Sequence, residues 1–178
     1  MIKGKFIGLR AVEKEDLKYL RDWRNLTEFR KNFREFRELS MSDQELWFES
    51  LQNSRQTNFM FTIVDLKNSK PIGAAGLLYV NWINRSADFS FYIGEKNLYI
   101  DEDPVSTEAV ELLINYGFSN LNLHKVWMEL YEFDIKKINF FKNRFNFKQD
   151  SLLRDNCFED GKYWNSIIIS LINTQKKQ

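Results

Sequence analysis

Residues 87–147 read ADFSFYIGEKNLYIDEDPVSTEAVELLINYGFSNLNLHKVWMELYEFDIKKINFFKNRFNF, and this stretch decides the fold. Apolar runs at 87–93 and 126–131 predict two strands, and apolar residues at helical spacing predict a helix after each. Asp103 suits an N-cap and Pro104 the first helical position, so the start of the first helix is well marked. The stretch therefore has the order strand, loop, helix, strand, helix.

The rest of the chain completes a mixed sheet around this unit. A capping box of Ser42 with Glu45 predicts the start of a helix before the second group of strands. Further strands are expected at 6–10, 59–66, 71–80, 147–158 and 163–172, and further helices at 13–23 and 135–145. We expect a mixed α/β (α+β) fold of about seven strands and four helices. It forms one domain over residues 1–173, followed by a polar tail at 174–178.

Composition and charge narrow the classes of partner and chemistry. The 178 residues carry 26 basic and 25 acidic side chains. The resulting net charge of +1 gives no reason to expect nucleic acid or a membrane surface as a partner. One cysteine, Cys157, and one histidine, His124, exclude an internal disulfide framework and a Cys/His metal cluster. No apolar run approaches the ~20 residues that span a bilayer, and the N-terminus lacks a signal-peptide core. We expect a soluble cytoplasmic protein without a metal site.

Several short motifs occur in one order along nearly the whole chain. They are Leu9-Arg10-Ala11-Val12, Asp22-Trp23-Arg24-Asn25, Lys70-Pro71-Ile72-Gly73, Phe91-Tyr92-Ile93-Gly94 and Leu121-Asn122-Leu123-His124-Lys125-Val126. In this order they resemble GNAT-superfamily N-acetyltransferases. The chain is similar to the branch that holds the ribosomal-protein N-terminal acetyltransferases and the acetyltransferases of amino-sugar nucleotides. The resemblance implies the GNAT fold, an N-acetyltransferase activity and acetyl-CoA as co-substrate.

The resemblance also implies where acetyl-CoA is held. In that family the two central parallel strands splay apart, and the edge of the first strand holds the pantetheine while the central helix N-terminus holds the pyrophosphate. Carried onto this chain, the cofactor-binding residues are Phe91, Tyr92, Ile93, Val105, Ser106, Thr107, Asp134 and Phe141. Phe141 stands where the family has the tyrosine that protonates the leaving thiolate. It cannot donate a proton, so core packing is the alternative for Phe141, and water or Tyr131 would supply the proton.

One loop departs from the family pattern. Where the family has a glycine-rich basic loop, this chain has Asp101-Glu102-Asp103-Pro104, with no glycine and three carboxylates. At ~5 Å each carboxylate would repel a phosphate charge by roughly 1 kcal/mol in water-like surroundings. Lys96, Lys142 or Arg144 could offset this charge. A GNAT-fold binding domain that no longer binds acetyl-CoA is therefore the rival hypothesis.

Polar residues on the two central strands are candidates for the acid–base chemistry. A base must accept the proton of the attacking amine, directly or through water. Strand alternation places Asp88 on one face of its strand with Tyr92, and Glu129 on one face with Tyr131. Asp88, Glu129 and Tyr131 are the catalytic candidates, with a solvated strand residue as the alternative for each carboxylate.

The segment 21–37 is the candidate acceptor surface. It holds six basic residues and three acidic ones, interleaved with Trp23 and three phenylalanines. Arginine with aromatics suits an amino-sugar nucleotide, which is the leading acceptor, ahead of a protein N-terminal amine. RNA, an acidic protein surface and a merely solvated face are the alternatives. The substrate-binding candidates are Trp23, Asn25, Arg30 and Trp82, and a homodimer is compatible with this interpretation.

Overall fold

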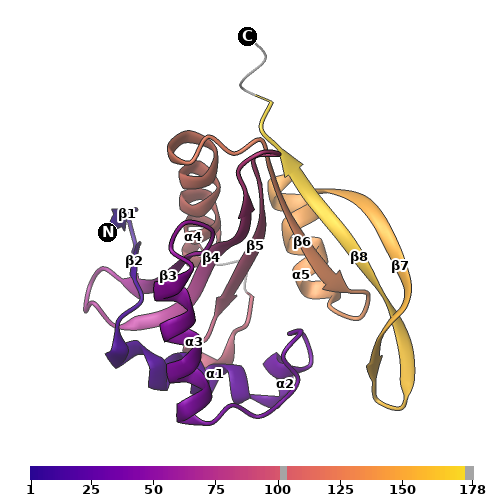
Figure 1. Ribbon diagram of the computed structural model, residues 1–178, viewed down its shortest axis with the longest axis horizontal. Helices are drawn as coiled ribbons and strands as arrows, with labels where there is room; N and C mark the ends of the chain where they lie inside the picture. The colour runs from indigo at the N-terminus through magenta and orange to yellow at the C-terminus, as the bar shows by residue number, and fades with distance from the viewer. Residues whose placement is uncertain (101–103, 175–178) are drawn as a thin grey trace.

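An eight-stranded sheet runs through the computed structural model, which describes residues 1–100 and 104–174 (Figure 1). Its strands are β1 Ile2–Lys3, β2 Ile7–Ala11, β3 Phe59–Asp65, β4 Pro71–Asn81, β5 Ser86–Ile93, β6 Lys125–Tyr131, β7 Lys148–Glu159 and β8 Lys162–Ile172. Across the sheet the order is β1-β2-β3-β4-β5-β6-β8-β7. Every neighbouring pair is antiparallel except β5 and β6, which are parallel as predicted. The sheet has one strand more than expected because the short β1 pairs with β2.

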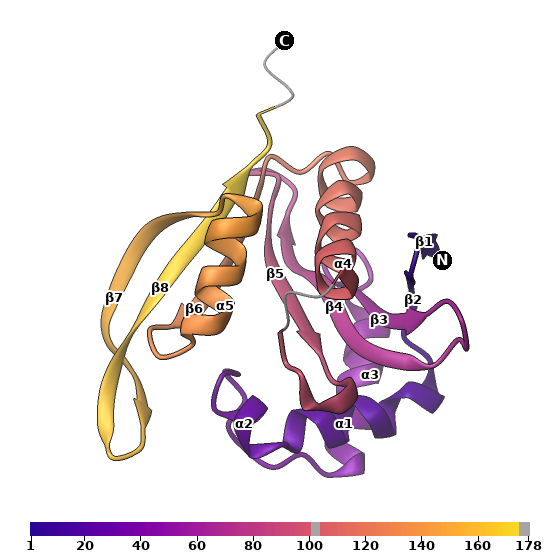
Figure 2. The same ribbon diagram turned by 180° about the vertical axis from the view of Figure 1, so that it is seen from behind.

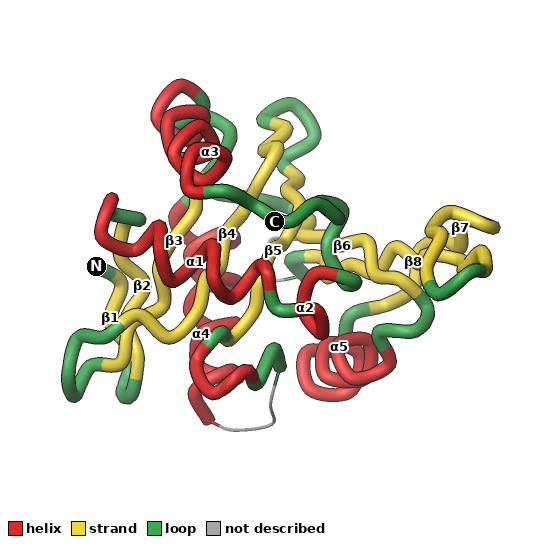
Figure 3. Tube along the Cα trace, turned by 90° about the horizontal axis from the view of Figure 1, so that it is seen from below, coloured by secondary structure: helices red, strands yellow, loops and turns green. Residues whose placement is uncertain are grey.

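Helices cover both faces of the sheet. Within the described residues the α-helices are α1 Leu17–Asn25, α2 Thr27–Arg30, α3 Met41–Asn53, α4 Pro104–Asn115 and α5 Ile135–Asn139. A π-helical turn extends α4 through Tyr116–Asn120, and another extends α5 through Phe140–Arg144. Figure 3 shows α1 and α3 on one face and α4 and α5 on the other. From behind, α4 and α5 lie on either side of β5 (Figure 2). The α-helix not expected from the sequence is α2.

The start of α3 differs from the prediction by two residues. The N-cap is Ser40, whose hydroxyl accepts from the Asp43 N–H while the Asp43 carboxylate accepts from the Ser40 N–H. The predicted Ser42–Glu45 box was therefore wrong. The reason lies in Asn25, whose side chain forms two hydrogen bonds with the backbone of Leu39 and holds the chain in place up to the cap.

One part of the core lies where α4 and α5 pack on the sheet. In α4, Ala109 and Leu113 are fully buried, whereas Leu112 is half-buried, and so is Tyr116 in the turn that extends the helix. On the α5 side, five phenylalanine rings from β5, the helix and the segment after it pack edge to face or stacked. They are Phe89, Phe91, Phe140, Phe141 and Phe147, and all are buried. Such ring pairs stabilise a core beyond the area that they bury.

The central feature of the sheet is the parting of β5 from β6. Their parallel ladder holds only three residue pairs, Ser86 with Lys125, Ala87 with Val126 and Asp88 with Trp127. Beyond Asp88, β5 stays paired with β4 and β6 stays paired with β8, while the two facing edges separate. Figure 1 shows the two strands diverging toward the end that carries α2. The sheet is thus split into two halves that share a short hinge of hydrogen bonds.

The chain ends in the predicted hairpin. β7 and β8 pair antiparallel around the turn at Asp160 and Gly161, where both residues have positive φ. Of the predicted polar tail, 174–178, only Thr174 belongs to the described residues. Within the described residues, no helix is long and apolar enough to cross a bilayer.

Candidate active site

Two carboxylates meet where β5 and β6 part. Asp88 is the last β5 residue in the parallel ladder, and Glu129 lies two residues beyond its partner Trp127 on β6. Arg34, from the loop after α2, joins them. Its Nη1 lies 2.9 Å from Asp88 Oδ2, and its Nε lies 3.5 Å from Glu129 Oε2. The two predicted candidates are therefore neighbours, and a cation is held between them.

The two carboxylates differ in environment. Burial raises the pKa of Asp88 above the usual carboxyl value, although the attraction of Arg34 opposes the shift. Glu129 is held by further donors, since its Oε1 accepts from Ser166 Oγ at 2.7 Å and from Asn156 Nδ2 at 2.8 Å. A carboxylate with a raised pKa and few donors is the better proton acceptor. The geometry thus favours Asp88 as base and Glu129 as a fixed negative charge.

Tyr131 lies beyond Glu129 on the same strand and is half-buried. Its ring packs against Phe133 with 5.5 Å between centroids. Burial raises the pKa of the Tyr131 hydroxyl, and a neighbouring Cys157 and Glu129 act in the same direction. The hydroxyl therefore stays protonated at neutral pH and is able to donate.

The edge of β5 beyond Asp88 holds the residues expected to line the pantetheine. The Phe91 ring stacks on Phe140, and its carbonyl oxygen accepts a hydrogen bond of 2.8 Å from Lys137 Nζ. The Ile93 N–H and C=O pair with the backbone of Tyr99, both at 2.8 Å. The partners of Phe91 and Ile93 are therefore a side chain and a loop, because the ladder with β6 ends at Asp88.

Tyr92 lies on the opposite face of β5 from Phe91. Its ring packs edge to face with Trp23, Phe29 and Phe33 from α1, α2 and the following loop. Burial raises the pKa of Tyr92 to about 12. This tyrosine anchors the N-terminal helices against the strand and is neutral at any physiological pH.

The N-terminus of α4 carries the residues expected at the pyrophosphate. Val105, Ser106 and Thr107 form its first turn after Pro104, and Ser106 is fully buried. Arg144, at the end of the helical segment that follows β6, donates from Nη1 to Thr107 Oγ1 at 3.1 Å. A positive charge therefore lies beside this helix end, as needed for a phosphate group. Asp101, Glu102 and Asp103 lie outside the described residues.

Asp134 and Phe141 occupy the two ends of the segment that follows β6. Asp134 is buried and caps α5, accepting from the Lys137 N–H at 3.2 Å. Its other oxygen accepts from the Tyr99 hydroxyl at 2.6 Å. Phe141 has no exposed surface and packs in the phenylalanine cluster. Their cofactor contacts remain predictions, and the position of Phe141 agrees with the alternative of core packing.

The four acceptor candidates are distributed over two places. Trp23 packs on Tyr92 and fills the space beside Gly94, while Arg30 lies 3.6 Å from the carboxylate of Glu38. Asn25 is engaged with the Leu39 backbone, as described above. Trp82 lies in the β4–β5 turn and donates to the Gln56 carbonyl at 2.8 Å. None of the four is among the described residues that line the pocket at the open end of the gap, and their binding role remains a prediction.

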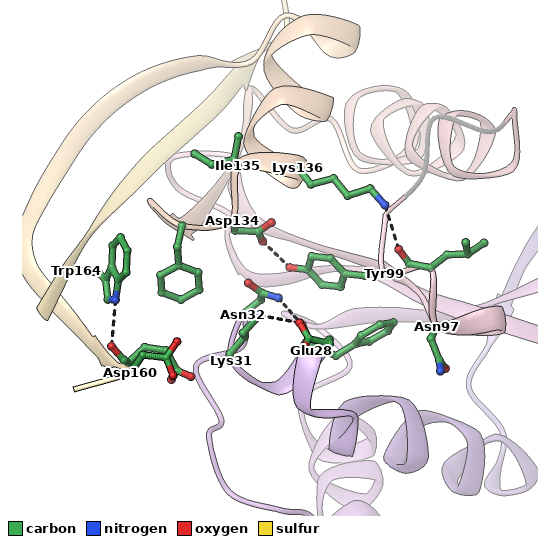
Figure 4. A pocket seen from close by; sticks show the side chains of 14 residues that line it. Glu28, Lys31, Asn32, Asn97, Tyr99, Asp134, Ile135, Lys136, Asp160 and Trp164 are labelled. Carbon is green, nitrogen blue, oxygen red and sulfur yellow. Dashed lines mark hydrogen bonds and ion pairs between the residues drawn. The ribbon is translucent and has the colours of Figure 1, made fainter. Parts of the chain in front are cut away.

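A pocket of about 430 Å³ lies at the open end of the gap (Figure 4). It is formed by α2, the loop after β5, the start of α5 and the tip of the β7–β8 hairpin. Acidic side chains outnumber basic ones there: Glu28, Asp134, Glu159 and Asp160 against Lys31 and Lys136. Aromatic rings complete the walls, from Phe29, Tyr99, Phe133 and Trp164. Acidic and aromatic groups together suit a cationic amine.

Sequence reasoning missed three residues of this region as site residues: Arg34, Tyr99 and Lys137. Lys137 carried a usable signal, because it shares a helix face with Phe141 four residues later, and a lysine on an apolar face is unusual. Arg34 lay within the candidate acceptor segment 21–37 but was not distinguished from its other basic residues, and Tyr99 carried no signal, since it reaches the gap from a loop whose path the sequence does not determine.

Comparison with known proteins agrees with this architecture. Residues 7–143 match the family described as Acetyltransferase (GNAT) domain. The chain is 25% identical over 170 residues to the spermidine N(1)-acetyltransferase of Escherichia coli K12, covering 95% of this chain and 87% of that protein. It is 24% identical over 162 residues to the enzyme of that name from Vibrio cholerae, covering 88% of this chain and 87% of that protein. The predicted GNAT fold, N-acetyltransferase class and acetyl-CoA co-substrate are thereby confirmed.

Solved structures show the same fold at lower identity. The Vibrio cholerae spermidine N-acetyltransferase in complex with CoA and spermine superposes with a TM-score of 0.82 at 22% identity, over 93% of this chain and 95% of that one. A dodecameric structure of that protein gives a TM-score of 0.75. These relatives are spermidine N-acetyltransferases, so the superfamily prediction holds, whereas the ribosomal-protein and amino-sugar branch is not specifically supported.

Proposed function

The chain belongs to the GNAT acetyltransferase family, and on this premise we propose that it transfers the acetyl group of acetyl-CoA to a primary amine of a polyamine. The observation that carries the proposal is the gap between β5 and β6, which opens directly beyond Asp88. At its base, Arg34 is held by the carboxylates of Asp88 and Glu129. A site that binds a guanidinium between two carboxylates suits an ammonium group of similar charge.

Asp88 is the proposed base. An acceptor ammonium that replaces Arg34 would lose a proton to Asp88, directly or through water, and become a nucleophile. Attack on the thioester forms the C–N bond and breaks the C–S bond, and the nitrogen releases its second proton to water as the amide forms. The CoA thiolate then takes up a proton from water or from Tyr131, whose hydroxyl stays protonated. Glu129 would hold the charged acceptor in place, because its own donors keep the carboxylate fixed.

Residues around the gap would hold acetyl-CoA. On the gap edge of β5, the Phe91 carbonyl, which accepts from Lys137 in the free protein, is the backbone group proposed for a pantetheine amide, since Tyr99 already pairs with both backbone groups of Ile93. The first turn of α4, with Arg144 beside Thr107, offers N–H dipoles and a positive charge for the pyrophosphate. The backbone N–H groups along the gap edge of β5 are the candidate donors to the oxyanion that forms during transfer.

The acceptor class is argued from the pocket at the mouth of the gap. A linear polyamine carries several ammonium groups, and the pocket offers an acidic excess with aromatic walls. One ring of this wall, Trp164, already lies under the ammonium of Lys162 at 3.6 Å from the ring centroid. The relatives in Escherichia coli and Vibrio cholerae, which are named for spermidine, support the same class.

An amino-sugar nucleotide was the leading acceptor from the sequence, but the segment 21–37 is less suited to bind it. Its diphosphate would need free cations, but four of the basic residues in 21–37 besides Arg34 are paired with carboxylates. The pairs are Arg21–Asp22, Arg30–Glu38, Lys31–Glu28 and Arg37–Glu35. Amino-sugar nucleotides and protein N-termini therefore become arms of the test.

The test is an acetylation assay that measures CoA thiol release with three acceptors: spermidine, an amino-sugar nucleotide and a peptide with a free N-terminus. We expect kcat/KM for spermidine to exceed the other two by at least about a hundredfold, the value of roughly 2.7 kcal/mol of selectivity. A preference for either of the others would overturn the polyamine proposal. Isothermal titration with CoA addresses the rival binding module, because a chain that binds no CoA cannot catalyse this transfer.

We also propose a single domain over residues 1–173 that assembles into a homodimer or larger multimer. One continuous sheet supports the first part. The second rests on large apolar side chains that the terminal hairpin exposes, at Leu152, Leu153, Phe158 and Tyr163. Light scattering after size exclusion measures the assembly directly.

A further inference from the structure

Lys137 is a buried lysine that the proposed reaction does not use. It is the third residue of α5, and only 6% of its surface is exposed. Its Nζ donates to the carbonyl oxygen of Phe91 at 2.8 Å and lies 3.4 Å from the Tyr99 hydroxyl. The side chain thus crosses from the helix that follows β6 to the edge of β5, across the gap between the two strands.

The contact is costly for a lysine. Among the described residues, no carboxylate oxygen lies within 4.0 Å of Lys137 Nζ, so neutral oxygens and the Tyr99 ring surround the ammonium. Burial without a direct counter-ion disfavours the charged form and lowers the pKa of Lys137, against the attraction of Asp134 and Asp88. A group held at such cost is more readily given up than one in a strand ladder.

The neighbouring contact is of a different kind. Tyr99 pairs with Ile93 through two backbone hydrogen bonds, and its hydroxyl is fixed by Asp134. Releasing it requires the backbone of the loop to move. Releasing Lys137 requires only rotation about the single bonds of a long, flexible side chain. Of the interactions on the gap edge of β5, the Lys137 contact is therefore the one that a ligand can displace at the lowest cost.

We propose that Lys137 is an internal competitor of acetyl-CoA, a positioning residue that occupies the Phe91 carbonyl until the pantetheine arm displaces it. The inference rests on the proposed function, because it requires the cofactor to enter the gap along β5. The ammonium holds the two walls of the gap in the free protein and lowers the affinity for CoA. A purely structural lysine would do the reverse, since its removal would loosen the site and weaken binding.

The test compares CoA affinity in the wild type and in Lys137→Met by isothermal titration. Methionine keeps an unbranched apolar stem in the same space and removes only the ammonium, so packing is largely preserved. Because a charged donor no longer competes for the Phe91 carbonyl, CoA should bind Lys137→Met about tenfold or more tightly. Lys18→Met, on the exposed face of α1, is the control for the loss of one positive charge.

Three results separate the possibilities. Unchanged or weaker CoA affinity in Lys137→Met would overturn the competitor role and leave the proposed function standing, provided that the wild type binds CoA. No CoA binding in either protein would overturn the proposed function itself. If Lys137→Met does not fold, nitrogen NMR of the wild-type lysine Nζ groups decides. The Lys137 pKa should rise toward the ordinary lysine value when CoA is added, and an unaltered pKa would contradict the displacement.

Discussion

The two edges of β5 differ, although they belong to one strand of eight residues. Along β4 the ladder runs from Ser86 to Ile93, with one register shift between Leu78 and Asn81. Along β6 it ends at Asp88, and side chains or a loop take over as partners. The first edge is stable because each bond is part of a cooperative ladder. The second is able to exchange partners, which is what a ligand-binding edge requires. Substitutions on the closed side should thus alter stability, and substitutions on the open side should alter catalysis.

Asp88→Asn should have the largest effect and should act on the open side alone. The amide cannot accept the amine proton, and general base catalysis typically contributes 10²- to 10⁴-fold. We therefore expect kcat/KM to fall by about that factor, while the melting temperature changes by no more than a few degrees. Arg34 is half exposed and keeps Glu129 as a partner, so the loss does not strand a buried charge. Wild-type-like turnover with spermidine would remove Asp88 from the mechanism.

Asp16→Asn is the matched change beside β2 and β3, in the continuous part of the sheet away from the gap. The buried Asp16 carboxylate accepts from both terminal nitrogens of Arg10, at 2.6 and 2.7 Å, and from Thr62 Oγ1 at 2.8 Å. Breaking a buried pair costs up to 3–5 kcal/mol, and we expect about 2–3 here because Arg10 is partly exposed. Urea unfolding measures the loss, with Asp22→Asn, whose pairs are exposed, as a control near zero. Equal losses in the two variants would contradict the ranking.

The pKa values of Asp88 and Asp16 are shifted in opposite directions, so their effects should appear at different pH. The Asp88 pKa is raised by burial, so kcat/KM should fall about tenfold per pH unit below that raised value. The Asp16 pKa is lowered overall, because Arg10 and other donors outweigh the opposing effect of burial. Its stabilisation is present above the unfolded-state pKa of about 3.9 and is lost as pH falls through the lower folded value. Activity should therefore be lost at a higher pH than the Asp16 contribution to stability. Coincident losses would contradict this order.

Glu108→Gln should give the smallest effect, again on stability. The Glu108 carboxylate, in α4, accepts from the backbone N–H groups of Lys5, Phe6 and Ile7. Glutamine keeps one acceptor oxygen but turns an amide donor toward those N–H groups. We expect a loss of about 1 kcal/mol, or a decrease of roughly 2–4 °C in melting temperature. A loss of activity at unchanged stability would show that this contact reaches the site.

The sequence predicted the helices and strands better than the tertiary contacts that they make. Periodicity placed β5, α4, β6 and the closing hairpin, because each depends on local apolar spacing. Asp88 and Glu129 were predicted from strand alternation, which holds irrespective of tertiary contacts. The start of α3 failed because two serines, Ser40 and Ser42, each precede an acidic residue by three positions. Only the tertiary bonds of Asn25 with Leu39 decide between them.

The open edge was not predictable in the same way. Its partners, Lys137 and Tyr99, act over 46 residues and across a loop, so no local pattern links them to Phe91 and Ile93. The expected acceptor changed for a similar reason, since the sequence gives the three carboxylates of 21–37 but does not show that each of them, and Glu38 beyond the segment, pairs with a basic residue. A sequence gives the number of charged side chains, whereas only the fold determines which of them are paired with an opposite charge.

The five packed phenylalanines on the α5 side of β5 bear on how fast the acetyl donor is hydrolysed. The rings carry no hydroxyl and all five side chains are buried, so they form an apolar layer on that side of β5. A thioester resting against such a layer would be protected from hydrolysis for as long as no amine arrives. We therefore expect the enzyme to hydrolyse acetyl-CoA only slowly in the absence of an acceptor amine.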